Sequence, residues 1–298
     1  MARTVVVTGA TGGLGRYFQA AQPDGMRLVL LGGRTAPQGG VAVDLSDRAA
    51  AVAALEAAAP DIIVHAAAMT DVDGCERDHD AAYESNVAAT RILADWAGNR
   101  EPGCRLVYIS TDQVYPGPGP SDEKAAPRPI NLYGWTKLWG EDIVLRQGDA
   151  LVVRLNFVGA GTGRRRSLSD FLITSLSGGR AVVLFRDVFF SPLFGGDVPA
   201  LLAEMIRQDA SGIFNLGCSG GGSKADFGLG LAARLGLSAA SATVGRLGDA
   251  ALAAPRPLDT RMDVARAETL LRRRLPSFDA VMDRVAAEWR SLHGEPVA

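Results

Sequence analysis

Tyr133 and Lys137, four positions apart, are the residues of this chain whose types and spacing best suit chemistry. On a helix, residues at i and i+4 lie on one face, so a phenol and an ammonium would be neighbours there. A free phenol has a pKa near ~10, and a nearby cation lowers it toward neutral pH. Such a tyrosine can give a proton to a carbonyl oxygen while a hydride reaches the carbon. Because this spacing also occurs by chance on many helices, its meaning depends on the surrounding elements.

A glycine-rich segment follows the first apolar run of the chain. The β-branched run Thr4–Thr8 predicts a strand buried on both faces, and Gly12–Ala21 can begin a helix. The segment between them has the spacing Gly-x-x-Gly-x-x-Gly, which lets a backbone turn tightly and approach a pyrophosphate at a helix N-terminus. The residues that we predict to bind a dinucleotide here are Gly9, Thr11, Gly12, Gly13, Leu14 and Gly15.

Strands and helices are predicted to alternate through the first half of the chain, which is typical of a parallel sheet. Ser46 is the predicted N-cap of an alanine-rich helix that ends before Pro60. The predicted strands are Thr4–Thr8, 27–31, 41–43, 61–65, 105–109 and 151–155, and the predicted helices are 12–21, 46–58, 80–96 and 131–147, the last carrying Tyr133 and Lys137. We therefore predict an α/β fold with a Rossmann-like doubly wound parallel sheet.

The rhythm changes after Asn156, where we predict a smaller interleaved C-terminal substrate lobe. Helices are expected at 171–177 and 197–208, and strands at 181–185 and 213–216. The predicted division is a Rossmann domain for NADP over residues 1–155, with a return at about 188–212, and a substrate-binding lobe formed by 156–187 and 213–298.

The end of the second strand bears on the choice between NAD and NADP. An acidic residue there would bind the ribose 2′-hydroxyl, whereas an arginine accommodates a 2′-phosphate. The sequence has Arg34 and no acid at this point, with Arg16 as a second candidate charge, so we predict NADPH over NADH. The alternative for Arg34 is a solvated loop arginine. We further expect Asp44 and Leu45 to meet the adenine, and the small residues Ala66, Ala67 and Ala68 to lie against the ribose and nicotinamide.

Composition excludes several other classes of function. The chain has 298 residues and a formal net charge of −2, so no global basic field favours nucleic acid or an anionic membrane. The N-terminal residues lack signal-peptide features, and no apolar run is long enough to cross a bilayer. Three widely spaced cysteines indicate free thiols in a reducing cytoplasm. The three histidines lack the spacing of metal ligands, and His65 is interpreted as a packed core residue.

Six motifs spread over the chain carry a resemblance to a known family. In order they are 8–15, 61–73, Tyr108-Ile109-Ser110-Thr111-Asp112-Gln113-Val114-Tyr115, 131–137, 212–216 and 256–263. With these motifs the chain resembles the extended short-chain dehydrogenase/reductases. Within them it is most similar to the dTDP-4-dehydrorhamnose reductases and related nucleotide-sugar 4-ketoreductases.

The resemblance implies roles for the matching positions. Thr111 would polarise the keto oxygen of a sugar, Tyr133 would donate the proton, and Lys137 would lower the tyrosine pKa and bind the nicotinamide ribose. Asn86 matches a helix asparagine that supports the lysine or a proton-relay water; the alternative is a satisfied mid-helix polar residue. The positions implied to line the sugar pocket are Thr70, Val72, Asp112, Gln113 and Phe157.

Two departures from the family pattern concern the sugar. Gln113 stands where the rhamnose reductases carry an aromatic residue, and Phe157 stands where they carry a tryptophan. The reacting groups remain, so the resemblance implies NADPH-dependent reduction of a nucleotide-linked 4-keto-6-deoxyhexose, with the exact sugar open. Arg164, Arg165 and Arg166 are either contacts for the diphosphate or a solvated basic loop.

Two other functions are compatible with the same motifs. One is an epimerase or dehydratase of the superfamily, although Gln113 replaces the second carboxylate that dehydratases add beside the catalytic hydroxyl. The other is a non-catalytic regulatory subunit that binds NADP. The helices at about 80–97 and 131–147 commonly pair between subunits in this superfamily, so the resemblance also implies a homodimer.

Overall fold

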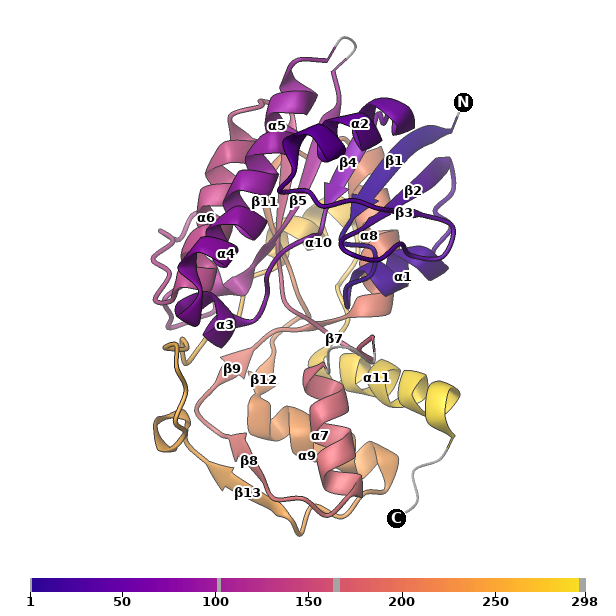
Figure 1. Ribbon diagram of the computed structural model, residues 1–298. Helices are drawn as coiled ribbons and strands as arrows, with labels where there is room; N and C mark the ends of the chain where they lie inside the picture. The colour runs from indigo at the N-terminus through magenta and orange to yellow at the C-terminus, as the bar shows by residue number, and fades with distance from the viewer. Residues whose placement is uncertain (1, 101–102, 163–166, 295–298) are drawn as a thin grey trace.

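The computed structural model describes residues 2–100, 103–162 and 167–294 (Figure 1). A large layered α/β part forms the upper half of Figure 1, and a smaller lobe lies below it. The chain passes between the two parts more than once. This arrangement confirms the predicted α/β class and the smaller second lobe.

A seven-stranded sheet, parallel throughout, is the centre of the larger part. Its strands run in the order β11-β6-β5-β4-β1-β2-β3. Their bounds are β1 Arg3–Thr8, β2 Met26–Gly32, β3 Val41–Ala42, β4 Ile62–His65, β5 Arg105–Thr111, β6 Ala150–Leu155 and β11 Gly212–Leu216. The order reverses between β1 and β4, and ligands of doubly wound sheets bind in the crevice at such a point, beyond the carboxyl ends of the strands.

Helices cover both faces of this sheet (Figure 1). On one face Leu55, Leu93 and Val144 belong to a core between the strands and α2, α5 and α6. On the other face the core includes Phe18 and Leu202, from α1 and α8. The helices of this part are α1 Gly15–Ala20, α2 Arg48–Ala58, α3 Val72–Arg77, α4 His79–Tyr83, α5 Ala89–Gly98, α6 Leu132–Leu145, α8 Val198–Arg207 and α10 Ala265–Leu271.

Two local predictions need correction. The N-cap of α2 is Asp47, which accepts hydrogen bonds from two backbone N–H groups, while the Ser46 hydroxyl donates to Asp44 instead. The helix predicted over 80–96 is present and runs without a break from His79 to Gly98, but its middle turn, η1 (Glu84–Ala88), is π-helical and not α-helical. This turn carries Asn86, one of the predicted site residues.

The smaller lobe packs α7 (Leu168–Ser177), α9 (Lys224–Leu235) and α11 (Phe278–His293) around a core of its own. The parallel pair β8 (Val182–Phe185) and β13 (Ala242–Gly245) forms its outer edge. The remaining elements are short: β7 Phe157–Val158, β9 Phe189–Phe190, β10 Leu193–Phe194, β12 Gly222–Ser223, η2 Asp112–Val114, η3 Gly195–Asp197 and η4 Leu247–Asp249.

The chain returns to the sheet with α8, inside the predicted range of about 188–212, and stays with the sheet beyond residue 212. β11 forms hydrogen bonds with β6 along its whole length, and Ala267 and Leu271 of α10 enter the core beneath the sheet. β11 and α10 therefore belong to the larger part, whereas the predicted division placed them in the substrate-binding lobe. Within the described residues, no helix is long and apolar enough to cross a membrane. Cys75, Cys104 and Cys218 are free thiols.

Candidate active site

A cavity of about 540 Å³ opens at the carboxyl ends of β1, β4 and β5, next to the start of α6. Most of the predicted site residues line it, although they come from five separate stretches of sequence. They are Gly9, Thr11, Gly12, Gly13, Leu14, Gly15, Ala66, Ala68, Thr70, Val72, Thr111, Asp112, Gln113, Tyr133, Lys137 and Phe157. Its volume lies within the ~300–1,000 Å³ common for small-molecule sites.

The glycine segment forms one wall because its backbone lies where side chains cannot fit. Gly9 has φ +69°, and a Cβ there would lie 2.7 Å from Cα of Ala67, at the end of the neighbouring strand. A Cβ on Gly15 would lie 2.3 Å from the carbonyl oxygen of Gly9. The glycines therefore let the segment turn tightly and pack against the end of β4 where it lines the cavity, a shape that suits close approach of a pyrophosphate. The Phe157 ring leans over the same wall, 3.5 Å from where a Cβ of Gly13 would stand.

The first turn of α6 holds Tyr133 against the turn that follows β5. Asn131 caps the helix by accepting the Gly134 N–H, and its amide donates to the Gln113 side chain at 3.0 Å. Gly134 allows the close contact, since a Cβ there would lie 2.6 Å from the carbonyl oxygen of Gln113. Thr111, Tyr133 and Lys137 are thereby brought together at one cavity, each less than a tenth exposed.

Thr111 and Asp112 form a small hydrogen-bonded group at the end of β5. The Thr111 hydroxyl donates to Asp112 Oδ1 at 3.1 Å and accepts the Gln113 N–H. Asp112 Oδ2 accepts from Asn156 and from the Thr260 hydroxyl, both at 2.7 Å. Burial raises the pKa of this carboxyl, against the hydrogen bonds that stabilise its ionised form. Asp112 thus orients Thr111 and joins the sheet to the second lobe through Thr260.

Lys137 lies under the site with only 2% of its surface exposed. Burial lowers the pKa of its ammonium to about 7, and the Glu141 carboxylate, one turn further along α6, opposes that shift. An ammonium that titrates near neutral pH is unusual and typical of functional sites.

Asn86 acts at a distance from the reacting groups. Its side chain accepts the Met69 N–H at 2.7 Å and donates to the Met69 carbonyl and to the Thr136 hydroxyl. Both amide hydrogens are used in this way. The role that the resemblance implied for Asn86, support of Lys137 or of a proton-relay water, stays a prediction. Asn86 fixes the loop after β4 relative to α6.

His65 is a packed residue of the sheet, which agrees with its interpretation as a core histidine. Thr8 Oγ1 accepts two backbone N–H groups and therefore donates to His65 Nδ1 at 2.7 Å. His65 Nε2 lies 3.0 Å from Thr90 Oγ1, whose own hydrogen goes to the Asn86 carbonyl. Burial lowers the pKa of His65 to about 3, with a further contribution from the Lys137 charge. The ring is neutral and protonated at Nε2.

The residues predicted to select the adenine end lie away from this cavity. Arg34 and Asp44 are exposed near the ends of β2 and β3, and hydrogen bonds from Ser46, with a smaller effect of Arg34, lower the pKa of Asp44. Leu45 is buried in the sheet core, and Ala67 packs beside it. Arg16 donates to the Ala160 carbonyl and pairs with Glu288, and its contribution of a second charge toward the phosphate stays a prediction. Arg164, Arg165 and Arg166 lie outside the described residues.

A second chamber of about 290 Å³ adjoins the first and shares Gln113, Asn156 and Leu168 with it. Apolar side chains from α7 and β8 line it, together with Lys224, Arg256 and Thr260. The Lys224 ammonium is attracted by Asp112, although burial lowers its pKa to about 8. Sequence reasoning missed Asn156, Lys224 and Thr260; only the quoted motif at 256–263 pointed toward one of them.

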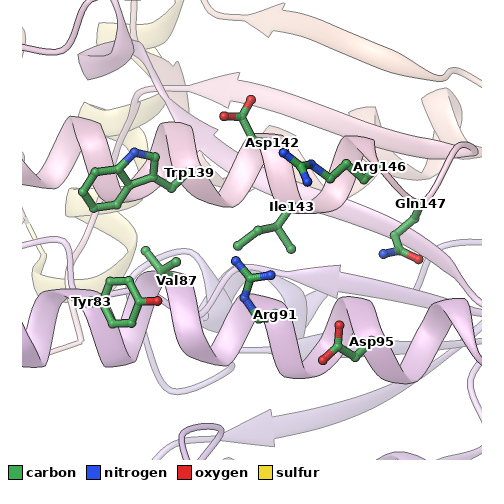
Figure 2. A pocket seen from close by; sticks show the side chains of 9 residues that line it. All are labelled: Tyr83, Val87, Arg91, Asp95, Trp139, Asp142, Ile143, Arg146 and Gln147. Carbon is green, nitrogen blue, oxygen red and sulfur yellow. The ribbon is translucent and has the colours of Figure 1, made fainter.

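A groove of about 490 Å³ lies between the helical stretch 83–95 and α6 (Figure 2). It shares no lining residue with the candidate active-site cavity. Figure 2 shows Tyr83, Val87 and Arg91 on one helical stretch facing Trp139 and Ile143 on the other. Tyr83 is 48% exposed and Trp139 39% exposed. Within the part of the chain that the structure describes, no cluster of three His, Cys, Asp or Glu side chains could hold a metal ion.

Comparison with known proteins matches this architecture to one family. The family model described as the RmlD substrate binding domain matches residues 3–291. The probable low-salt glycan biosynthesis reductase Agl14 of Haloferax volcanii is 32% identical over 232 residues, covering 76% of this chain and 77% of that protein. Methionine adenosyltransferase 2 subunit beta of Danio rerio is 40% identical over 146 residues, which are 48% of this chain and 44% of that protein.

Solved structures with a similar fold include members of the same kind of reductase. dTDP-4-dehydrorhamnose reductase from Bacillus anthracis, in complex with NADP, superposes with a TM-score of 0.86 at 25% identity and covers 97% of this chain and 100% of its own. The Thermus thermophilus UDP-glucose 4-epimerase complexed with NAD has a TM-score of 0.80 at 20% identity over 96% of this chain and 99% of its own, a likeness of fold alone.

Proposed function

Because the chain belongs to the RmlD substrate-binding domain family, we propose that it reduces the 4-keto group of a nucleotide-linked 4-keto-6-deoxyhexose with NADPH. The observation that carries the proposal is the convergence of Thr111, Tyr133 and Lys137 on one cavity that the glycine segment also lines. A hydroxyl, a phenol and an ammonium beside a dinucleotide cradle are the groups needed to turn a ketone into an alcohol.

In this reaction the bound NADPH supplies the hydride to the carbonyl carbon. Tyr133 gives its phenolic proton to the carbonyl oxygen, so one hydride and one proton convert C=O into CH–OH. The Thr111 hydroxyl, released from Asp112, donates a hydrogen bond to the same oxygen and orients the carbonyl. The Lys137 ammonium stabilises the phenolate left on Tyr133 until a proton returns from solvent.

The preference for NADPH rests on Arg34. Its side chain is exposed at the end of β2, where the 2′-phosphate of a dinucleotide lies in this type of sheet. The NADP complex of the related reductase supports the same choice. We expect Arg34→Ala to weaken NADPH binding more than NADH binding, measured by fluorescence titration of both coenzymes.

The adjoining chamber supports a nucleotide-linked sugar over a free one. Its apolar wall suits a base, and Lys224 and Arg256 suit the charge of a diphosphate. Gln113 and Asn156 lie at the passage between the chambers, where the sugar would sit.

The decisive experiment offers a panel of nucleotide-linked 4-keto sugars and follows NADPH oxidation. We expect Tyr133→Phe to lower turnover by a factor of ~10²–10⁴ while NADPH still binds, since the variant lacks only the acid. Thr111→Val tests the polarising hydroxyl in the same assay. Near wild-type turnover by Tyr133→Phe would rule out this assignment, and interconversion of sugars without net NADPH consumption would indicate an epimerase.

A second candidate is a non-catalytic NADP-binding subunit. The likeness to methionine adenosyltransferase 2 subunit beta favours it, although the match covers less than half of that protein. The complete set of Thr111, Tyr133 and Lys137 favours catalysis. Co-purification with a constant partner, together with no turnover across the panel, would support the subunit.

We also propose that the protein is a homodimer in the cytoplasm, joined through the groove of Figure 2. Exposed Trp139 and Tyr83 provide apolar area there, and exposed Trp135 lies beside Trp139, with ring centroids 6.2 Å apart. Arg91 and Asp142 offer charges of both signs to a symmetric copy. Sedimentation should give a dimer that Trp139→Glu converts to a monomer. The matched substitution Leu292→Glu, at an exposed leucine of α11, should leave the dimer intact.

A further inference from the structure

Tyr108 of β5 lies directly beneath the lysine of the site. It is fully buried, and the Lys137 ammonium nitrogen stands 4.0 Å from the centroid of its ring. A cation over the face of an aromatic ring is attracted by the ring quadrupole, and the attraction is strongest where water is excluded. The contact therefore partly replaces the hydration that Lys137 loses on burial.

A glycine of α6 makes room for this ring. A Cβ on Gly140 would lie 2.1 Å from the Tyr108 hydroxyl oxygen and 2.5 Å from Cζ. The helix can pass this close to β5 only because residue 140 has no side chain. Gly140 stands three residues after Lys137, so the ring contacts the same helix face that presents the ammonium.

The nearest counter-charge, Glu141, is held in place by other groups. Arg154 donates to both of its oxygens, at 3.0 Å to Oε1 and 2.6 Å to Oε2, and Ser110 donates to Oε1 at 2.5 Å. Among the described residues, no ion pair joins Lys137 to Glu141 directly. The carboxylate acts on the ammonium from a fixed position, and the ring of Tyr108 makes the direct contact.

The groups that face Lys137 come from three elements. Tyr133 and Glu141 lie on its own helix, Tyr108 on β5, and the neutral His65 on β4. The ring and the carboxylate favour the charged ammonium, while the Lys137 charge helps to keep His65 neutral.

We propose that Tyr108 is a positioning residue, whose ring face keeps the Lys137 ammonium charged and directed at the site beside Tyr133. The inference rests on the proposed function, in which that ammonium serves Tyr133. It also makes a claim about the cofactor-free protein that is independent of turnover.

The test compares Tyr108→Leu with Tyr108→Phe, which keeps the ring and removes only the hydroxyl. The alkaline limb of kcat/KM against pH should fall by about one pH unit in Tyr108→Leu, given the strength of such contacts. Tyr108→Phe should keep the wild-type profile. Equal alkaline limbs in the two variants would overturn the proposal.

A second measurement separates this idea from the proposed reaction. In protein carrying ¹³C at the lysine ε position, the Lys137 signal, assigned by its loss in Lys137→Arg, should titrate at lower pH in Tyr108→Leu than in Tyr108→Phe. Should no sugar be reduced at all, this titration still decides about Tyr108.

Gly140→Ala serves as a third variant, since it keeps the ring but displaces it. It should shift the titration of Lys137 in the same direction as Tyr108→Leu. An unshifted titration in well-folded Gly140→Ala would also refute the proposal.

Discussion

Burying the Lys137 ammonium lowers the stability of the folded chain, and the site accepts this cost because the proposed reaction uses the charge. Lys137 has a pKa of about 7 in the folded chain, against an ordinary value near ~10.4. Below pH 7 both states are protonated, and the full cost of burying the charge reduces stability. Between the two values the folded state has released its proton while the unfolded state keeps it, so stability rises with pH.

Lys137→Met removes this buried charge and should stabilise the cofactor-free protein while abolishing reduction. The gain in melting temperature should be larger at pH 6 than at pH 9, because much of the cost has disappeared by pH 9. Thermal unfolding followed by circular dichroism at both values measures it. Lys124→Met, at an exposed lysine, is the control and should change little at either pH. An identical change for Lys137→Met at both values would contradict the assigned burial cost.

At the scale of elements, the π-helical turn Glu84–Ala88 places one side chain where it can bridge two segments. Asn86 satisfies both the N–H and the carbonyl of Met69 and also binds Thr136 of α6. π-Helical turns within α-helices are frequently found at functional sites. The turn therefore connects the loop after β4 to the helix that presents Tyr133 and Lys137.

Asn86→Ala should destabilise the protein by about 1–3 kcal/mol, because it leaves the Met69 N–H without its acceptor and removes the amide donor to the Met69 carbonyl. Urea unfolding gives the difference in free energy. Asn99→Ala, at an exposed asparagine that bonds the Asp95 carbonyl near the end of α5, should cost much less. A loss at Asn86 no greater than that at Asn99 would mean that the bridge contributes nothing.

Elements with a strong periodic pattern were predictable, and those set by single polar contacts were not. The β-branched runs of β1 and β4 and the glycines between β1 and α1 indicated the sheet and the cradle. Asp47 and not Ser46 caps α2, because the Asp47 carboxylate accepts two N–H groups of the helix while the Ser46 hydroxyl donates to Asp44, a choice that composition does not reveal. α9 went unpredicted because Gly228 and Gly230 interrupt it, although its capping box, Ser223 with Asp226, was readable.

The candidate site divides in the same way. Residues adjacent to strand ends or in a helix motif, such as Thr111 and Tyr133, could be proposed from sequence. Thr260 lies 148 residues from its partner Asp112 and meets it only because the second lobe folds back against the sheet. In the sequence Tyr108 is an ordinary strand residue. Its proposed positioning of Lys137 depends on contacts with Gly140 and Lys137 of α6, which form only in the folded chain.

For the whole molecule, the central question is what holds the second lobe against the glycine segment. Glu288 of α11, near the end of the chain, accepts the Tyr17 hydroxyl at 3.0 Å and the Ala160 N–H at 2.7 Å. It also pairs with Arg16 at 3.2 Å. One carboxylate thus joins the first helix, the loop after β7 that borders the cavity, and the last helix.

We expect Glu288→Ala to weaken NADPH binding and to lower stability by about 2–4 kcal/mol, since it leaves the Ala160 N–H and a partly buried Arg16 without their acceptor. Isothermal titration with NADPH and urea unfolding measure the two effects. Asp283→Ala, on the same helix but in an exposed pair with Arg234, is the matched control and should cost at most ~1 kcal/mol without changing NADPH binding. If both variants lose stability equally and bind NADPH as the wild type does, Glu288 does not join the lobes. A selective loss at Glu288 would mean that closure of the lobe against the cradle is built into the fold before any ligand arrives.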